Sequence, residues 1–339
     1  MATIKEIADK AGFSIATVSK VLNGVGNISS ETRQQILNIA NELNYHPNIH
    51  ARNLKAGSSK TIGIITEDLT VFNAPEIVDG IASVCDKMRY HYILGNLRLY
   101  KLYGNGAKDE EAVRNSTQNL IDHMLSNQVE GIIYIGCHSH VVTNPTNHRN
   151  LKFVYSYCLC SDNSVPSVIY NEEKAAYEAT LLLLKNPNAI LGMITGPTNS
   201  IHTTNRIKGF QKALFEKGIP FNPALSLTGD WDRDSGYVLG KELIENGVNS
   251  IFAQNDLMAA GVIDYCNNTG INVGSDVHII GFDNREISSA LRPKLSTVEL
   301  PLFAIGVESA NQMFNILHGG SFPKKNILLD CKLIERETT

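Results

Sequence analysis

Apolar residues recur with a helical period in three short runs near the start of the chain. The first run places them at i, i+3, i+4 and i+7: Ile4, Ile7, Ala8 and Ala11. The next two runs follow similar spacing: Val18, Val21 and Leu22, then Ile36, Ile39, Ala40 and Leu43. This spacing is that of one face of an amphipathic helix. The pattern therefore predicts three consecutive helices.

The breaks between these runs carry helix-ending and helix-starting residues. Gly12 suits the end of the first helix, and Ser14 suits the cap of the second. Asn23-Gly24 ends the second helix, and Ser29 caps the third. Helices joined by so short a turn form a helix-turn-helix unit, which places the start of its second helix in the DNA major groove. The alternative is a small helical bundle that binds nothing.

The outward face of the second helix combines small, hydroxyl and basic side chains: Ile15, Ala16, Thr17, Ser19 and Lys20. Hydroxyl groups and helix N-termini bind phosphate oxygens, and apolar side chains contact thymine methyl groups. This composition favours DNA binding.

From Thr61 onward, short apolar strands alternate with amphipathic helices. The expected strands are TIGIITED, HYILGN, GIIYIG, KFVYSY, AILGMITG, SIFAQND and HIIGFD. The expected helices are EIVDGIASVCDK, NSTQNLIDHMLSN, EKAAYEATLLLL, TNRIKGFQKALFEKG, SGYVLGKELIEN and DLMAAGVIDYCNNTG. Strict alternation predicts an α/β fold with parallel sheets, and the number of units suffices for two doubly wound subdomains.

Ligands of such sheets bind at the carboxyl ends of the strands. Four residues at or after expected strand ends suit a sugar: Arg206, Trp231, Asn255 and Asp283. Planar polar groups bind vicinal hydroxyls, and an aromatic face covers the apolar side of a sugar ring. Each residue also has a structural interpretation: Asp283 as a cap, Asn255 as a turn residue, Trp231 as core.

Charge is distributed unevenly along the 339 residues. The net charge is −4, whereas residues 1–60 contain seven Lys/Arg and four Asp/Glu, or +3, which leaves −7 for the remainder. A basic segment on an acidic body suits a nucleic-acid reader attached to a ligand-responsive domain. No signal peptide and no apolar run of about 18 residues is found. We expect a cytoplasmic, nucleoid-associated protein without membrane contact.

Other candidate chemistry is weak. The six cysteines lack zinc-type spacing, and we expect no metal and no cofactor. A metal site at His138 and His140 is conceivable. The carboxylate runs Asp109-Glu110-Glu111 and Glu172-Glu173 are expected to be solvated surface. Because no Ser/His/Asp or Cys/His arrangement has supporting context, we expect no enzyme.

The segment TIKEIADKAGFSIATVSKVLNG, with ISSETRQQI and NELNYHPNIHARNLKAG after it, resembles the headpiece of the LacI/GalR family of bacterial repressors. The resemblance assigns base reading to Ile15, Ala16 and Lys20. It assigns phosphate anchoring to Thr3, Ser14, Thr17, Ser19, Asn23, Thr32 and Tyr45. Many relatives carry Arg where this chain has Lys20, so a bidentate guanine contact is replaced by a point charge.

The run from Asn48 to Lys55 matches the family's hinge helix, which is too short to be stable alone in water. Its DNA-contacting positions are Asn48, Ala51, Leu54 and Lys55, with Leu54 as a wedge in the minor groove. The expected domains are a helix-turn-helix headpiece (1–47), hinge helix and linker (48–60) and an effector-binding and dimerisation domain (61–339). The last divides into subdomain N, about 61–166 and 299–323, and subdomain C, about 167–298 and 324–339.

The body resembles the family's periplasmic-binding-protein fold. In members that answer to galactosides or galactose, Arg206, Asn255 and Asp283 match hydroxyl-binding positions, and Trp231 matches the ring-stacking one. Phe72 and Val78 match an apolar lip on subdomain N. A further contact is expected near Ser156 or Tyr157, and the segment 98–112 is expected either to line the pocket or to lie on the surface.

The resemblance implies a homodimeric repressor of carbohydrate-utilisation genes that reads a pseudo-palindromic operator and is controlled by a small sugar, such as a galactoside. The chain ends without a leucine heptad tail, which fits a dimer rather than a tetramer. A catabolite-control regulator with phosphorylated HPr as corepressor is the first alternative. A sugar-binding transport protein and a sugar-modifying enzyme are disfavoured.

Overall fold

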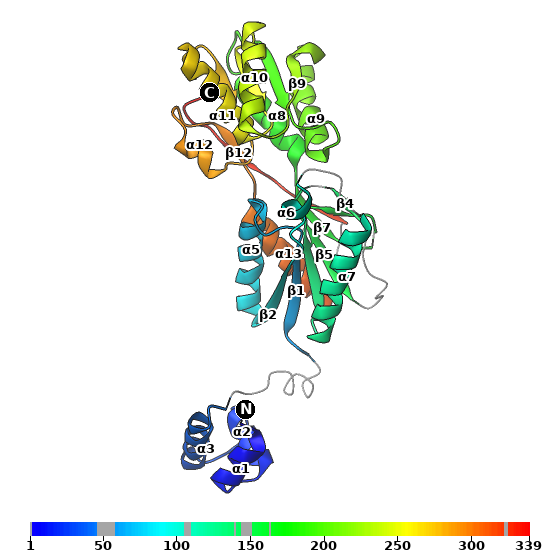
Figure 1. Ribbon diagram of the computed structural model, residues 1–339, viewed down its shortest axis with the longest axis vertical. Helices are drawn as coiled ribbons and strands as arrows, with labels where there is room; N and C mark the ends of the chain where they lie inside the picture. The colour runs from blue at the N-terminus through cyan, green and yellow to red at the C-terminus, as the bar shows by residue number, and fades with distance from the viewer. Residues whose placement is uncertain are drawn as a thin grey trace. The chain divides into compact units, whose positions relative to one another are not determined.

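The computed structural model describes residues 2–45, 58–104, 110–138, 140–143, 151–162, 164–321 and 325–339 (Figure 1). The chain divides into two compact units, Met1–Ser59 and Lys60–Thr339.

The first unit contains the three expected helices, α1 (Ile4–Ala11), α2 (Ile15–Leu22) and α3 (Ser30–Glu42). Thr3 caps α1 in a reciprocal arrangement with Glu6, and Gly12 ends it with a φ of +69°. Because this left-handed conformation suits glycine, the chain turns sharply into the Ser14 cap of α2. The helices enclose a small core that contains Ile7, Val18, Val21 and Ile36.

The second unit contains a six-stranded parallel sheet in the order β13-β7-β5-β3-β1-β2. Its strands are β1 (Thr61–Thr66), β2 (His91–Asn96), β3 (Gly131–Ile135), β5 (Lys152–Ser156), β7 (Ser167–Tyr170) and β13 (Asn326–Leu329). Neighbouring residues of β1 face opposite sides, since Ile64 and Ile65 belong to different core clusters. Helices α5 (Asn73–Met88) and α13 (Leu302–Leu317) cover one side, and α7 (Glu110–Ser126) covers the other.

A four-stranded parallel sheet in the order β11-β10-β8-β9 forms the other subdomain. Its strands are β8 (Leu191–Thr195), β9 (Ser226–Thr228), β10 (Ser250–Ala253) and β11 (His278–Ile280). Its helices pack in pairs: α8 (Glu172–Leu183) with α9 (Ile201–Glu216), and α10 (Arg233–Glu245) with α11 (Asp256–Thr269). The second pair meets at Gly236 and Gly261, where a Cβ atom would overlap the main chain of the partner helix.

Shorter elements complete the unit. They are β4 (Val141–Val142) paired with β6 (Leu159–Cys160), α6 (Leu99–Tyr103), the 3-10 turn Pro223–Leu225, α12 (Glu286–Ala290), and β12 (Thr297–Glu299) paired antiparallel with β14 (Lys332–Ile334).

The boundaries expected between the subdomains need correction. The residues of β7 and β13 were not expected to form strands and fell within the range given to subdomain C, but β7 and β13 pair with each other and β7 pairs with β5 in the six-stranded sheet. The chain therefore passes to the other subdomain after Tyr170, returns between β12 and α13, and passes over again after Leu329. The reason is that the backbone hydrogen bonds of both strands are satisfied in this sheet, where β13 is the edge strand and β7 lies between β13 and β5. Helix α13 was absent from the sequence expectation.

None of the helices in the described ranges combines the length and the apolar character needed to cross a bilayer.

Candidate functional site

Helix α2 presents the expected DNA-reading face to solvent. Ile15 is 50% exposed, and Ala16 and Lys20 are exposed as well. On the opposite face Val18 and Val21 are buried in the headpiece core. The face of α2 that is expected to read DNA is thus accessible, and the opposite face is not.

Several expected phosphate anchors already serve as helix caps. The hydroxyl groups of Thr3 and Ser14 accept hydrogen bonds from the backbone N–H groups of Glu6 (3.3 Å) and Thr17 (3.1 Å). A hydroxyl that accepts one bond keeps its proton for another acceptor. Thr32 accepts a bond from the Ser29 hydroxyl at 2.9 Å.

The remaining anchors differ in exposure. Asn23 is exposed and donates to the Ser19 carbonyl, Ser19 and Thr17 are half-buried, and Tyr45 packs against the headpiece core. The hinge positions Asn48, Ala51, Leu54 and Lys55 lie outside the described residues.

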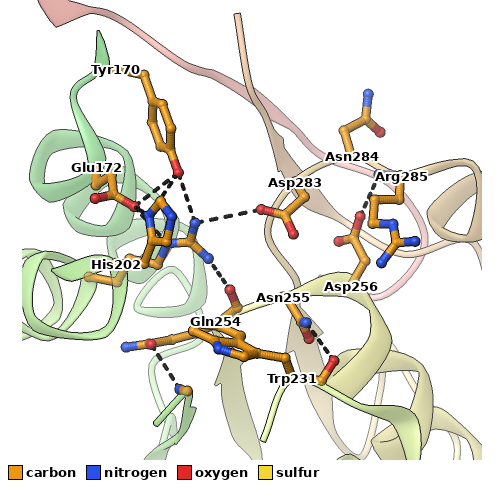
Figure 2. Close-up of polar contacts among 12 residues, drawn as sticks. Tyr170, Glu172, His202, Trp231, Gln254, Asn255, Asp256, Asp283, Asn284 and Arg285 are labelled. Carbon is orange, nitrogen blue, oxygen red and sulfur yellow. Dashed lines mark hydrogen bonds and ion pairs between the residues drawn. The ribbon is translucent and has the colours of Figure 1, made fainter. Parts of the chain in front are cut away.

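Arg206 forms the centre of the expected effector site, and its partners Tyr170, Glu172, Gln254 and Asp283 are labelled in Figure 2. Its side chain, 3% exposed, projects from α9 and lies over the Phe282 ring at 3.8 Å. It donates to the Gln254 carbonyl and to the Tyr170 hydroxyl (3.1 Å), and lies 3.4 Å from Glu172 and 3.6 Å from Asp283. Two carboxylates therefore surround one buried guanidinium.

Asp283 follows β11 and belongs to this cluster. Burial raises the pKa of its carboxyl group to about 6, against the lowering effect of Arg206, His202 and Arg285. Within the described part of the chain the carboxylate accepts no hydrogen bond. Its φ of +106° is uncommon for a residue with a side chain. A strained backbone thus holds a carboxylate with unused acceptor capacity beside Arg206.

Trp231 follows β9 and Asn255 follows β10, the strands on either side of β8, and a hydrogen bond links the two residues. The Asn255 amide donates to the Trp231 carbonyl at 2.8 Å, and its oxygen caps α11 by accepting from the Met258 N–H at 2.8 Å. The Trp231 indole lies 5.8 Å from the Arg206 guanidinium. The site therefore contains all four residues expected from the sequence, and Asn255 also serves as a cap.

Glu172 corrects a sequence expectation. We expected solvated surface, but the side chain is 3% exposed and contacts Arg206 and His202. Burial alone would raise its pKa, whereas the charges of His202 and Arg206 bring the pKa down to about 2. The carboxylate is buried because it follows strand β7 directly and begins α8 at the carboxyl edge of the sheets.

The contacts expected from subdomain N are only partly present. Phe72 precedes α5 and its ring lies 5.2 Å from the Arg285 guanidinium, whereas Val78 packs against the main core cluster. Tyr157 lies in the site, with its ring 6.1 Å from that of His202. Ser156 is buried instead and accepts a hydrogen bond from Ser309.

The described part of segment 98–112 is anchored near the ends of β1 and β2. Leu99 is buried, and the backbone N–H of Lys101 donates to Asp68 at 2.9 Å. At the position considered for a metal site, His140 Nε2 lies 3.0 Å from Glu67 Oε1. No group of three or more potential metal ligands occurs among the described residues.

Sequence reasoning missed Tyr170, His202 and Gln254. One signal was available: His202 and Arg206 are four residues apart, which places them on one face of α9. Tyr170 lies at the end of a strand that the pattern did not reveal, and Gln254 immediately precedes Asn255. The site as a whole presents the carboxylate of Asp283, the guanidinium of Arg206, the amide of Asn255 and the indole of Trp231. This combination suits recognition of a polyhydroxylated ring.

Comparisons with known proteins match both units. The family model for bacterial regulatory proteins of the lacI family matches residues 3–48, and the model for a periplasmic binding protein-like domain matches residues 188–339. The regulator RegA of Clostridium saccharobutylicum is 32% identical over 346 residues, which cover 100% of each chain. Catabolite control protein A of Priestia megaterium is 30% identical over 343 residues, which cover 99% of each.

Among solved structures, a lac repressor dimer bound to operator and the anti-inducer ONPF has a TM-score of 0.80 at 25% identity. The match covers 100% of this chain and 99% of that one. These relatives are transcriptional regulators, not enzymes. The chain therefore belongs to the lacI family of bacterial regulatory proteins and is a DNA-binding transcriptional regulator.

Proposed function

We propose that this regulator is a homodimeric repressor whose operator affinity is controlled by a small sugar bound around Asp283, Arg206, Asn255 and Trp231. Two copies of α2 related by a two-fold axis read a pseudo-palindrome. The hinge segment with Leu54 orders between them on DNA, as the family resemblance implies. Sugar binding then changes the geometry that the paired hinge segments need.

The observation that carries the effector proposal is the state of Asp283. Its carboxylate lies beside a buried guanidinium and accepts no hydrogen bond from the described residues. Two hydroxyl groups of a sugar would satisfy its oxygens, while the Trp231 ring covers the apolar face. Such a buried carboxylate is stabilised when donors arrive, which provides binding free energy.

A catabolite-control regulator that answers to phosphorylated HPr is the second candidate. Full-length similarity to catabolite control protein A favours it. The Arg206 donors also engage Gln254 and Tyr170 already, so a sugar does not find them free.

One experiment separates the two candidates. A duplex selected from a random pool by the full-length protein is titrated with protein alone, with a panel of mono- and disaccharides, and with phosphorylated HPr. We expect a sugar to change duplex affinity, and Asp283→Ala to abolish that change while leaving affinity without sugar intact. A response to phosphorylated HPr alone would transfer the proposal to the second candidate. A chain that responds to neither partner would contradict both.

A further inference from the structure

Arg285 lies two residues beyond Asp283 on a firmly held segment of main chain (Figure 2). Its backbone N–H donates to Asp256 at 2.7 Å. The preceding residue, Asn284, donates to Glu299 (2.8 Å) and accepts from Arg336 (2.7 Å). The position of the Arg285 Cα atom is thus fixed by contacts that do not involve its own side chain.

The Arg285 guanidinium differs from that of Arg206 in its partners. It is half-buried and faces the Phe72 ring at 5.2 Å, which is a contact between the two subdomains. No carboxylate lies within ion-pair distance of it in the described part of the chain, whereas Arg206 has Glu172 and Asp283. An aromatic ring attracts the cation but offers no oxygen acceptor.

The neighbouring acids neutralise Arg285 only in part, because the Arg285 charge acts on Asp283 but the Asp283 ion pair is made with Arg206. Asp283 faces Arg206 at 3.6 Å. Burial together with the charge of Asp283 raises the pKa of Asp256 to about 8, so this carboxyl group is mostly protonated near neutral pH. A partly desolvated cation without a carboxylate is unfavourable unless an anion joins it.

We propose that Arg285 binds an anionic group of the effector, a phosphate or a carboxylate, while Asp283 and Trp231 hold the hydroxylated ring. The inference rests on the proposed function and narrows its ligand class to sugar phosphates or sugar acids. Arginine suits either anion because its planar fork donates two parallel hydrogen bonds. The Phe72 ring, from the other subdomain, keeps the guanidinium beside the site.

Three hexoses that differ only at one position provide the test: galactose, galactose 6-phosphate and galacturonate. Calorimetric titrations use the full-length protein, Arg285→Gln, and Lys217→Gln as a control that removes an exposed positive charge from the same subdomain. We expect wild type and control to bind one anionic form at least about tenfold more tightly than galactose, as one charge-assisted contact implies. Arg285→Gln should lose that preference and keep its affinity for galactose.

The preferred anionic form identifies the group, phosphate or carboxylate. Equal affinity of the wild type for all three hexoses, or a preference that survives in Arg285→Gln, would overturn the inference.

Inorganic phosphate decides the case in which no hexose binds. Melting temperatures are compared in potassium phosphate and potassium chloride at equal ionic strength and pH. A ligand that binds only the native state raises the melting temperature. We expect phosphate to raise it in wild type and Lys217→Gln more than in Arg285→Gln; equal increases in all three reject the inference. The proposed function fails separately, when no sugar of any charge changes duplex affinity.

Discussion

The Trp231 indole packs directly on the main chain of Gly196, so closely that a Cβ atom on this glycine would overlap the benzene part of the ring. Strand β8 ends just before Gly196, and this residue leaves room for the ring at the carboxyl edge of the sheet. The backbone N–H of Gly196 is held by the Gln254 side chain at 3.1 Å.

We expect Gly196→Ala to displace the Trp231 ring and to lower sugar affinity about tenfold or more, because the stacking surface moves. Trp231 is the only tryptophan, so its fluorescence reports the displacement directly. Ser200→Ala is a control in the same loop, since that side chain makes no capping bond. An unchanged emission spectrum in Gly196→Ala would contradict the packing.

Sugar binding should depend on pH through Asp283. The pKa of this group is about 6, and the ionised form is the one that accepts two hydroxyl donors. Affinity should therefore fall as pH decreases below about 6, by at most about tenfold per pH unit. The measurement is a set of titrations between about pH 5 and about pH 7, which is about one unit on either side of this pKa. Asp283→Asn should bind weakly with a flat profile.

We expect ionisation of Asp256 to lower the stability of the folded protein at high pH. Its pKa in the folded protein is about 8, above the ordinary value of 3.8, so between these values the folded state holds a proton that the unfolded state has lost. The free energy of unfolding should fall as pH rises from about 4 to about 8, by at most about 1.4 kcal/mol per pH unit. Asp256→Asn resembles the protonated form and should flatten this slope in urea unfolding curves. A wild-type slope equal to that of the variant would refute the assignment.

For Glu172 we expect the opposite pH dependence of the free energy of unfolding, at low pH. Its pKa is lowered to about 2 from 4.5, so its stabilising effect is complete above pH 4.5 and is lost as pH falls through about 2. We expect Glu172→Gln to cost about 3 kcal/mol at neutral pH, because it leaves a buried Arg206 with one carboxylate. The difference from wild type should shrink in acid. Glu173→Gln, an exposed neighbour, should change little.

Truncation of Ile15 should cause a defect that is confined to DNA binding. Because the Ile15 side chain is exposed in the headpiece, Ile15→Ala should leave the melting temperature unchanged. It should lower the affinity for the selected duplex about tenfold. Affinity for an unrelated duplex and the salt dependence should stay the same, since no phosphate contact is removed. Val18→Ala, which truncates a buried residue, should instead lower the melting temperature. A stability loss in Ile15→Ala would contradict its exposure.

Sequence patterns predicted the headpiece better than the body for a physical reason. Caps such as Ser14 and the turn at Gly12 are local, so the residues that determine them are adjacent in sequence. Strands β7 and β13, at one end of the six-stranded sheet, pair with each other across more than a hundred residues of sequence (Ser167 with Asn326). The pattern therefore gave the α/β class but placed these strands on the wrong side of a subdomain boundary.

The candidate site shows the same distinction. Arg206, Asn255 and Asp283 were predicted because each follows a strand that the pattern revealed, whereas Trp231, the only tryptophan, follows a strand, β9, that the pattern did not reveal. Glu172 was assigned to the surface because its burial depends on His202 and Arg206, which reach it from another helix. Nothing in the sequence indicated a role for Arg285, because its capacity to bind an anion depends on which carboxylates lie near it in the folded chain.

Tyr157, Trp231 and Asp283 all have positive φ values, +62°, +75° and +106°, and all follow strands at the same site. Conformations of this kind cost about 1–3 kcal/mol each for residues with side chains, and the surrounding packing must hold them in place. A main chain fixed in this way makes a rigid template. Divergence of ligand preference among descendants of this chain would then proceed by exchanging side chains such as Arg285 on an unchanged frame, rather than by remodelling the loops.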